Sequence, residues 1–315
     1  MELPNLSDLG AETFLLRRYA IEGSDIWSAF NPSIAQDQQG DYWVVFRASN
    51  YFFSTEGSVG LTGGTKVYNR MFIGRLDPIT MLFDEKSLKE VDTRRLRSDI
   101  ERGIEDARLF FDGKHWCLSA TFLEKTVPVA RICKITLKSL AEPEVLQIDV
   151  LPAPDPQRVE KNWMPLHKVG TLAKSKTDFM YNLTTTVSKG KFQKVSDEDR
   201  FQTYRGGTQV LPIGDGTSIC LVHETHSKTV SGFSPTTFTN QRMQRRYLHR
   251  FVRLDDKNRV IQVSDQFFLH KDGVEFAAGI APYQDGFVIS FGRQDVASYL
   301  STISLGHLLL TLKDV

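Results

Sequence analysis

The chain has 315 residues, of which 41% are hydrophobic and 24% charged, and its net charge is +1. This composition is that of a globular protein, and near-neutrality provides no overall field that would attract nucleic acid or an anionic membrane. No apolar run approaches the ~20 residues of a membrane span, and residues 1–10 lack the basic and apolar plan of a signal peptide. We therefore expect a cytoplasmic protein without nucleic-acid partners.

Five segments, taken in chain order, repeat one pattern. Each begins with polar or glycine residues, continues as a short apolar strand, turns on Gly or Asp, and returns as a strand rich in β-branched and aromatic residues. Gly after Asp or Asn is the strongest hairpin signal in a sequence. The five segments are residues 31–49, 105–122, 161–183, 206–225 and 277–295.

Five units in this chain leave about 60 residues per unit, slightly more than the ~40–50 of familiar propeller repeats. The repeat predicts an all-β fold, a five-bladed β-propeller with a central funnel, formed as one domain by residues 1–315. A pair of irregular β-sandwiches is the alternative. Only two stretches, Asp77–Arg95 and Tyr299–Leu312, could hold short helices.

Two further stretches have the composition of long loops. Tyr51–Lys66 is rich in Gly and aromatic residues, and His226–Arg246 is rich in Ser and Thr and ends in Q-R-M-Q-R-R. Loops of this length commonly form lids or walls of a binding site, although a solvated insertion is an equal alternative.

The three cysteines are spread over the chain without a C-x-x-C pair. Cys117 and Cys220 stand inside alternating apolar runs, and Cys133 is distant from both. This pattern predicts buried thiols rather than a disulfide framework or a zinc site. No spacing of His and Asp indicates another metal site, and we expect neither a metal nor a cofactor.

In a propeller the innermost strand of each blade lines the central channel, so the polar residues at the starts of these strands meet at one mouth. Carboxylates, cations and aromatic rings together suit a sugar, and the excess of cations suits a phosphate or another oxyanion. The predicted mouth contains Asn31, Arg47, Glu105, Asp106, Arg108, Lys161, Asn162, Trp163, His223, Tyr247, His249, Arg250, Arg293 and Asp295.

Asp106 is the candidate acid of this set, since glycosyl transfer needs a group that protonates the departing oxygen. Glu105 would raise the pKa of Asp106 and Arg108 would lower it, and the sequence leaves the sum open. No second carboxylate is obviously placed as a base. The alternatives are a surface ion cluster around Asp106, a structural role for His223 and a core position for Trp163.

In the segment Y-L-H-R-F-V, Tyr247 and His249 share one face of a predicted strand and Arg250 lies on the other. A shift of one residue in register exchanges the two faces. The sequence therefore leaves open which of His249 and Arg250 faces the site.

The second of the five segments resembles a motif of glycoside hydrolase family 130, the β-mannoside phosphorylases and their β-mannosyltransferase relatives, which are five-bladed propellers. In that family a G-x-E-D-P-R motif carries the catalytic Asp. Here Gly103, Glu105, Asp106 and Arg108 match it, and Ala107 replaces the proline.

The resemblance extends over nearly the whole chain, from about Asn31 to Leu312. N-P-S at Asn31–Ser33 resembles the first-blade sugar motif, R-V-E-K-N-W-M-P-L from Arg158 resembles the third-blade Lys motif, and F-G-R-Q-D at 291–295 resembles the last-blade motif that ends in a sugar-binding Asp. His223 and Y-x-H-R resemble residues on the phosphate side.

The family implies inversion at the anomeric carbon and a relay in which the proton of Asp106 reaches the leaving oxygen through a sugar hydroxyl. Asp106 is then the acid in phosphorolysis and the base in synthesis. The candidate sugar contacts are Asn31, Arg47, Glu105, Arg108, Asn162, Trp163 and Asp295. The candidate phosphate contacts are Arg158, Lys161, His223, Tyr247, His249 and Arg250.

The sequence thus predicts an inverting enzyme that transfers a glycosyl unit, mannosyl by resemblance, between a β-mannoside and phosphate or an activated donor. The expected partners are a sugar or oligosaccharide acceptor and phosphate, a sugar phosphate or a sugar nucleotide. A hydrolase on the same scaffold and a non-catalytic carbohydrate-binding propeller are the alternatives. The acceptor, the linkage and whether the chain forms a homo-oligomer stay open.

Overall fold

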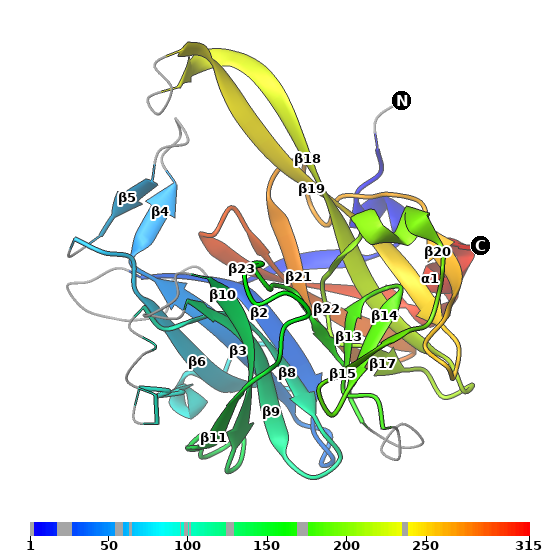
Figure 1. The fold of residues 1–315 in the computed structure, drawn as a ribbon, viewed down its shortest axis with the longest axis horizontal. Coiled ribbons are helices and arrows are strands. Elements are labelled where there is room, and N and C mark those ends of the chain that lie inside the picture. The colour runs from blue at the N-terminus through cyan, green and yellow to red at the C-terminus, as the bar shows by residue number, and fades with distance from the viewer. Residues whose placement is uncertain are drawn as a thin grey trace.

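Five antiparallel sheets surround a central axis in the computed structural model of this chain, which confirms the predicted all-β, five-bladed propeller (Figure 1). The structure describes residues 3–17, 27–53, 59–62, 65–94, 96–97, 100, 102–123, 129–168, 176–234 and 239–315. We number the blades in chain order. No helix among these residues is long and apolar enough to cross a membrane.

The first two blades are regular four-stranded sheets whose strands follow one another from the axis outward. Blade 1 consists of β2 (Ser28–Gln36), β3 (Tyr42–Ser49), β6 (Asn69–Leu76) and β7 (Lys89–Glu90). Blade 2 consists of β8 (Ile104–Phe111), β9 (Trp116–Leu123), β10 (Ala130–Leu137) and β11 (Val145–Val150). A separate two-stranded ribbon follows β3 and consists of β4 (Tyr51–Phe53) and β5 (Val59–Leu61).

The other blades have shorter inner strands or strands taken from the chain ends. Blade 3 consists of β12 (Met164–Pro165), β13 (Phe179–Asn182), β14 (Thr185–Ser188) and β15 (Lys191–Lys194). Blade 4 consists of β16 (Arg205–Gly206), β17 (Leu211–Pro212), β18 (Ser218–Ser234), β19 (Thr239–Leu254), β20 (Val260–Ser264) and β24 (Leu312–Asp314). Blade 5 consists of β21 (Glu275–Tyr283), β22 (Gly286–Arg293), β23 (Ala297–Ser304) and β1 (Glu12–Arg17).

Helical structure in the described ranges is confined to short pieces. They are the 3₁₀ helices η1 (Leu6–Leu9), η2 (Glu85–Ser87) and η4 (Asp199–Thr203) and the α-helix α1 (Leu305–Leu310). The two stretches expected to hold helices contain η2 and α1, but residues 299–304 belong to strand β23, because they pair continuously with β22 from Tyr299↔Phe291 to Ser304↔Gly286.

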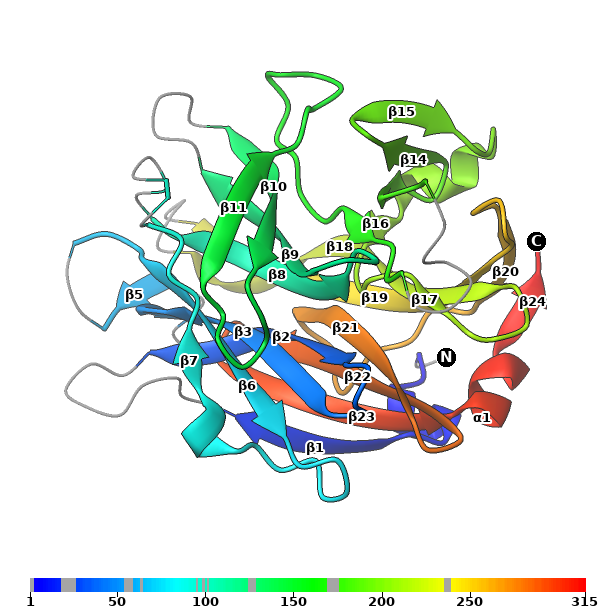
Figure 2. The same cartoon turned by 90° about the horizontal axis from the view of Figure 1, so that it is seen from below.

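The ring closes through the N-terminal strand. β1 pairs with β23 and is the outermost strand of blade 5, so segments from opposite ends of the chain meet in one sheet (Figure 2). The C-terminal strand β24 pairs in the same manner with β20 of blade 4. Because both pairings add a strand from near a chain end to a blade's outer edge, they secure blades 4 and 5.

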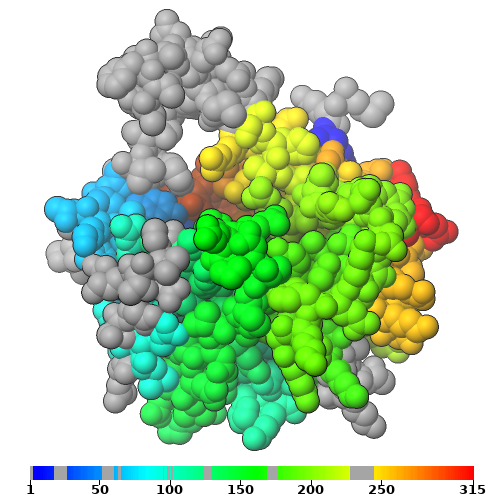
Figure 3. All heavy atoms as spheres, viewed as in Figure 1, coloured from blue at the N-terminus to red at the C-terminus, as the bar shows by residue number. Residues whose placement is uncertain are grey.

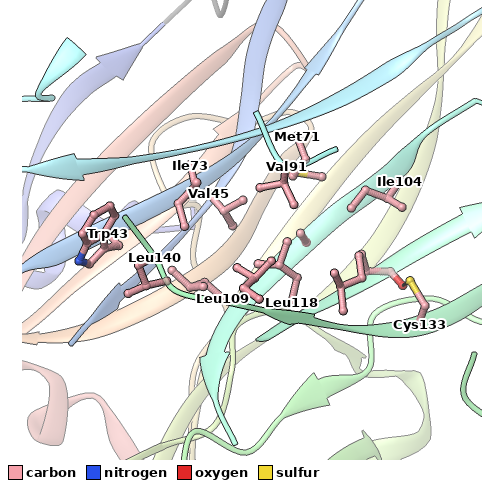
Figure 4. Close-up of a cluster of buried hydrophobic side chains, with 14 of the residues drawn as sticks. Trp43, Val45, Met71, Ile73, Val91, Ile104, Leu109, Leu118, Cys133 and Leu140 are labelled. Carbon is pink, nitrogen blue, oxygen red and sulfur yellow. Dashed lines mark hydrogen bonds between the residues drawn. The ribbon is translucent and has the colours of Figure 1, made fainter. Parts of the chain in front are cut away.

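Hydrophobic side chains pack between neighbouring blades. The described residues form five buried clusters, one at each of the five blade interfaces. Figure 4 shows the cluster between blades 1 and 2, where Val45 and Ile73 face Leu109 and Leu118. Each fully buried side chain of this size contributes roughly 1.5–3 kcal/mol relative to an exposed one. Since the inner strands β2 and β21 pack on both faces, nearly all of their residues are buried.

One polar side chain ties the inner strands together at the axis. The amide of Gln209, from the segment between β16 and β17, donates hydrogen bonds to the carbonyl oxygens of Ile34 and Ile280, both at 2.8 Å. Its oxygen accepts from the backbone N–H of Ile280 at 3.3 Å. Blades 1, 4 and 5 are therefore joined by a single buried amide.

The stretch His226–Arg246 is not the loop that its composition predicts. β18 and β19 pair without interruption from Ser218↔Leu254 to Ser231↔Gln241, and the ribbon projects from the propeller body (Figure 1). β18 and β19 are already paired within blade 4, and continuing their hydrogen-bonded ladder requires no additional turn. A polar stretch can therefore remain a strand. Residues 235–238 lie outside the described part of the chain.

We expect Gly292→Ala to destabilise the propeller, because blades 5 and 1 approach each other too closely at this position for a side chain. A Cβ at Gly292 would lie 2.0 Å from Asn31 Oδ1 and 2.4 Å from the Asn31 backbone nitrogen. Crowding of this kind costs about 1–3 kcal/mol. Denaturant unfolding measures the loss.

Gly306→Ala is the matched control, since a Cβ at Gly306 in α1 meets nothing within 4 Å. Alanine is the better helix former by up to about 1 kcal/mol, so this variant should be as stable as the parent or slightly more so. Equal unfolding midpoints for the Gly292 and Gly306 variants would refute the close approach.

Candidate functional site

The starts of the inner strands surround a cavity of about 610 Å³, as the repeat predicts. In Figure 3, atoms of blade 5 are visible at depth between the first blade and the green and yellow residues of blades 3 and 4. The polar and aromatic side chains in its lining are those of Asn31, Arg47, Tyr51, Asn69, Arg102, Glu105, Asp106, Thr121, Phe122, Lys161, Asn162, Arg205, His223, Arg245, Tyr247, Phe276 and Asp295.

Three of these residues share an unusual backbone. Asn31, Asp106 and Asn162 have φ angles of 50°, 50° and 64°, in the left-handed region. Asn31 and Asp106 also lie where the register shifts between the first and second strands of their blades. Short polar side chains tolerate this conformation better than others, and a bulge redirects its side chain. Equivalent residues of three successive blades therefore point into one cavity.

Asp106 is a carboxylate held by polar groups of blade 1. Its Oδ1 accepts hydrogen bonds from Asn31 Nδ2 at 2.8 Å and Arg47 NH1 at 3.2 Å, and 19% of the side chain stays exposed. Burial acts to raise the pKa of Asp106, but Arg47, the Asn31 hydrogen bond and Lys161 outweigh it, so the pKa lies below its usual value. Asp106 is an ionised carboxylate at neutral pH.

Arg47 connects the charges of this wall. It is buried, and its guanidinium contacts Glu105 Oε1 at 3.4 Å as well as Asp106 and donates to Asn69 Oδ1 at 2.8 Å. Burial alone would lower the pKa of Arg47, but Glu105 and Asp106 raise it. Lys161 adds a second cation at 3.4 Å from Glu105 Oε2.

Arg108 is buried behind the cavity rather than in its lining. It donates to the carbonyl oxygens of Gly207 at 2.7 Å and Asp106 at 2.9 Å, and to Asn162 Oδ1 at 3.1 Å. Burial lowers the pKa of Arg108 to about 10, and Asp106 opposes this. Through these three hydrogen bonds, Arg108 joins blades 2, 3 and 4 beneath the cavity.

The wall formed by blade 4 is aromatic and cationic. The rings of His223 and Tyr247 stack with centroids 4.9 Å apart, and Arg205 and Arg245 line the cavity with them. Burial, then His249 and Arg108, hold the pKa of His223 well below its usual value, so this imidazole is neutral. Neither arginine forms an ion pair within the described part of the chain.

The structure decides between His249 and Arg250. His249 packs behind His223, with ring centroids 6.1 Å apart, and burial lowers its pKa to about 3. Arg250 lies on the opposite face of β19, where it contacts Glu224 at 3.2 Å and the carbonyl of Ser264 at 2.8 Å. His249 belongs to the site side but does not line the cavity.

Three other residues proposed for the site are placed elsewhere. Trp163 is a core residue between blades 2 and 3, and its indole donates to Glu160 Oε2 at 3.0 Å. Arg158 is exposed outside the cavity lining. Arg293 faces the buried carboxylate of Glu275, at 3.7 Å, and also lies outside the lining. The cavity lining thus leaves out these three residues and Arg250, and also Arg108 and His249, which pack behind it.

Sequence reasoning missed Asn69, Arg102, Thr121, Phe122, Arg205 and Phe276 as lining residues, whereas Tyr51 and Arg245 belong to the two stretches that it proposed as lids or walls of a site. Arg102 stands one residue before the matched Gly103, and Arg205 stands one residue before the Gly206–Gly207 pair, so position next to a strand start was an available signal. Asn69 and Phe276 lie inside ordinary strand patterns. Only the fold brings them to the cavity. No group of three or more His, Cys, Asp or Glu in the described residues could hold a metal ion.

At the level of sequence, no family model and no curated protein matches this chain. Solved structures do match its fold. One of them is a structure from glycoside hydrolase family 130, a family of mannoside phosphorylases that contains hydrolases acting on β-1,2-mannosidic linkages in Candida mannan. Its TM-score is 0.58 at 15% identity, and the match covers 93% of this chain and 91% of the other.

Two further structures have the same fold. The β-1,2-mannobiose phosphorylase from Listeria innocua, solved with β-1,2-mannobiose, gives a TM-score of 0.54 at 14% identity, with 92% of this chain and 94% of that one covered. A GDP-Man-dependent mannosyltransferase from Leishmania mexicana gives 0.55 at 13% identity, with 93% and 90% covered. This chain thus shares the five-bladed fold of family 130 phosphorylases and of a mannosyltransferase.

Removing the charge of Arg47 should raise the pKa of Asp106. In Arg47→Gln, burial continues to favour the protonated acid, while the largest opposing contribution is lost. Carboxyl ¹³C NMR titration, assigned by comparison with Asp106→Asn, measures the shift. The same change in Arg94→Gln, whose side chain is 63% exposed and lies outside the cavity lining, is the control and should leave the resonance unmoved. An unchanged titration in Arg47→Gln would contradict the assigned environment.

Proposed function

We propose that this protein is an inverting enzyme that transfers a mannosyl unit between a β-mannoside and an anionic partner, which is phosphate, a sugar phosphate or a sugar nucleotide. One observation carries the proposal. A single cavity contains an ionised carboxylate on the wall of blades 1 and 2 and, among the described residues, cations without an ion pair on the wall of blade 4. The fold shared with mannoside phosphorylases and a mannosyltransferase supports mannose as the sugar.

Asp106 is suited to act as a base. The pKa of Asp106 lies below its usual value, so in the free enzyme this side chain is a carboxylate that can accept a proton. In synthesis the acceptor oxygen bonds to the anomeric carbon, its proton passes to Asp106 through a sugar hydroxyl, and the bond from that carbon to the phosphate oxygen breaks. The electron pair leaves with the phosphate.

The blade 4 wall would receive this leaving phosphate. Arg205 and Arg245 have no acid to neutralise among the described residues, and guanidinium groups bind phosphate in a bidentate manner. Tyr247 adds a hydroxyl to the same wall, where its ring stacks on that of neutral His223. Lys161, which is 47% exposed and pairs with Glu105, lines the cavity as a further cation. An anion bound at this wall would therefore place a sugar between it and Asp106.

A hydrolase is the second candidate, and Asp295 is the observation that favours it. This second carboxylate lines the same cavity, and an inverting hydrolase needs one carboxyl group as acid and another as base for water. Burial raises the pKa of Asp295 in spite of Arg47 and Tyr51, so the two carboxylates have unlike environments. Release of free mannose from β-mannobiose without phosphate would establish this alternative.

Asp106→Asn should abolish transfer. The carboxamide keeps the shape of the side chain but cannot take a proton, and loss of such a group costs about 10²–10⁴-fold in rate. The assay offers mannose-1-phosphate or GDP-mannose with a panel of mannose acceptors and follows phosphate or GDP release. Asp265→Asn, at a 74% exposed carboxylate paired with Lys313, is the matched control and should retain activity. Full activity of the Asp106 variant with any donor would refute the mechanism.

Arg205→Gln and Arg245→Gln should weaken binding of the anionic substrate alone. Each removes a charged hydrogen bond, worth about 1.5–3 kcal/mol, so KM for phosphate or the donor should rise about 10–100-fold. KM for the uncharged sugar acceptor should change less than about threefold. Equal increases in both KM values would show that the arginines do not form an anion subsite.

A further inference from the structure

A tyrosine that the sequence did not single out contacts the second carboxylate of the cavity. The hydroxyl of Tyr51, at the start of β4 after blade 1, donates to Asp295 Oδ2 of blade 5 at 2.6 Å. Both residues line the cavity together with Arg47 and Asp106. This contact joins residues 244 positions apart. It is a short hydrogen bond to a carboxyl group, of the kind that fixes a side chain firmly.

The backbone that carries Tyr51 is held by its neighbour. Asn50 is 3% exposed and connects to the far end of the Gly-rich stretch: its Nδ2 donates to the carbonyl of Lys66 at 3.0 Å, and its Oδ1 accepts from the N–H of Tyr68 at 2.8 Å. The N–H of Thr62 donates to the Asn50 carbonyl at 2.8 Å. These hydrogen bonds hold the backbone at residue 50 against residues 62, 66 and 68. They therefore fix the direction in which the chain enters β4 at Tyr51.

The ring of Tyr51 is packed as well as its backbone. Its edge meets Phe30 at a centroid distance of 5.8 Å, and the guanidinium carbon of Arg47 lies 5.7 Å from the ring centre. Arg47 in turn lies 5.0 Å from the centre of Phe30. The residue is thus 8% exposed overall, and its hydroxyl reaches the cavity from a fixed ring.

Asp295 has less support of its own. It follows Gln294 in the short turn between β22 and β23, and both residues are left-handed, with φ angles of 54° and 53°. Among the described residues, no hydrogen bond reaches its second oxygen, Oδ1. The Tyr51 hydroxyl therefore selects the orientation in which Oδ1 is available to a ligand.

The Tyr51 hydrogen bond also affects the charge of Asp295. Burial raises the pKa of Asp295, Arg47 and the Tyr51 hydroxyl lower it, and Asp106 raises it again. Without the Tyr51 hydroxyl the carboxyl group would be protonated up to a higher pH. The phenol thus favours the ionised form, which accepts hydrogen bonds from sugar hydroxyls.

We propose that Tyr51 is a positioning residue for substrate recognition: it holds Asp295 so that the free carboxylate oxygen accepts a hydroxyl of the glycosyl unit bound beside Asp106. The proposal rests on the proposed glycosyl transfer and adds the residue that orients the second carboxylate. Tyr51 acts on the substrate through Asp295, whereas Asp106 takes part in the proton transfer.

Tyr51→Phe removes only the hydroxyl and tests the proposal. With mannose-1-phosphate or GDP-mannose, whichever the enzyme uses, KM for the mannosyl donor should rise about tenfold, as expected for one charged hydrogen bond, while kcat stays within about twofold. The acidic limb of the kcat/KM profile should move to higher pH, because the pKa of Asp295 rises. Tyr68→Phe, at an exposed tyrosine whose side chain lies outside the cavity lining, is the matched control and should change neither value.

A double-mutant cycle separates positioning from general packing. Asp295→Gly removes the carboxylate and permits the left-handed backbone. If Tyr51 acts through Asp295, adding Tyr51→Phe to this variant changes KM by less than about twofold. An additional tenfold rise in the double variant, or an unchanged KM in Tyr51→Phe, would overturn the proposal.

Binding of mannose to the whole protein, measured by isothermal titration calorimetry, distinguishes this failure from that of the proposed function. A parent protein that binds mannose and turns over a donor, with a Tyr51→Phe variant of equal affinity, would refute only the role of Tyr51. A parent protein that neither binds mannose nor uses any donor would refute the proposed function and the inference together.

Discussion

The rest of the site depends on the buried guanidinium of Arg108. An unpaired charge is costly to bury, and here the cost is offset by hydrogen bonds to oxygens from three blades: those of Asp106, Asn162 and Gly207. No carboxylate within the described chain forms an ion pair with it, so its charge acts on the cavity. Only a planar group with several fixed donors can reach all three oxygens, and lysine could not replace it.

This arrangement fixes both the shape and the electrostatics of the cavity. Arg108 holds the backbone of Asp106 at the bulge where its φ angle is positive, while Arg47 and Asn31 bind the carboxylate from blade 1. The same buried charge keeps His223 neutral together with burial and His249. A carboxylate able to accept a proton and a neutral imidazole thus stand in one cavity, where burial alone would have favoured a protonated acid.

The fold tolerates large changes in sequence because its stability is distributed over five similar interfaces. The three solved structures compared above share the propeller at 13–15% identity, so most positions along the chain differ. Hydrophobic clusters need volume and apolar character more than particular residues. The residues at the strand starts are more constrained than those of the hydrophobic clusters. Few substitutes fit a left-handed bulge, an arginine that binds three oxygens, or a glycine packed against a neighbouring backbone.

The sequence by itself determined the repeat, the five blades and most of one cavity wall. Turn residues and alternating strands are local signals, and Asn31, Asp106 and Asn162 stand at matching places of successive repeats. Trp163 and Arg250 were expected in the site because the sequence pattern does not show whether a side chain points into the cavity or away from it. His226–Arg246 was expected to be a loop because its polar composition gives no sign that the pairing of the two strands in blade 4 continues through it. Only the tertiary structure brought Tyr51 to Asp295 and Asn69 to Arg47, and set the pKa of Asp106. These features depend on distances between blades, which no local pattern in the chain encodes.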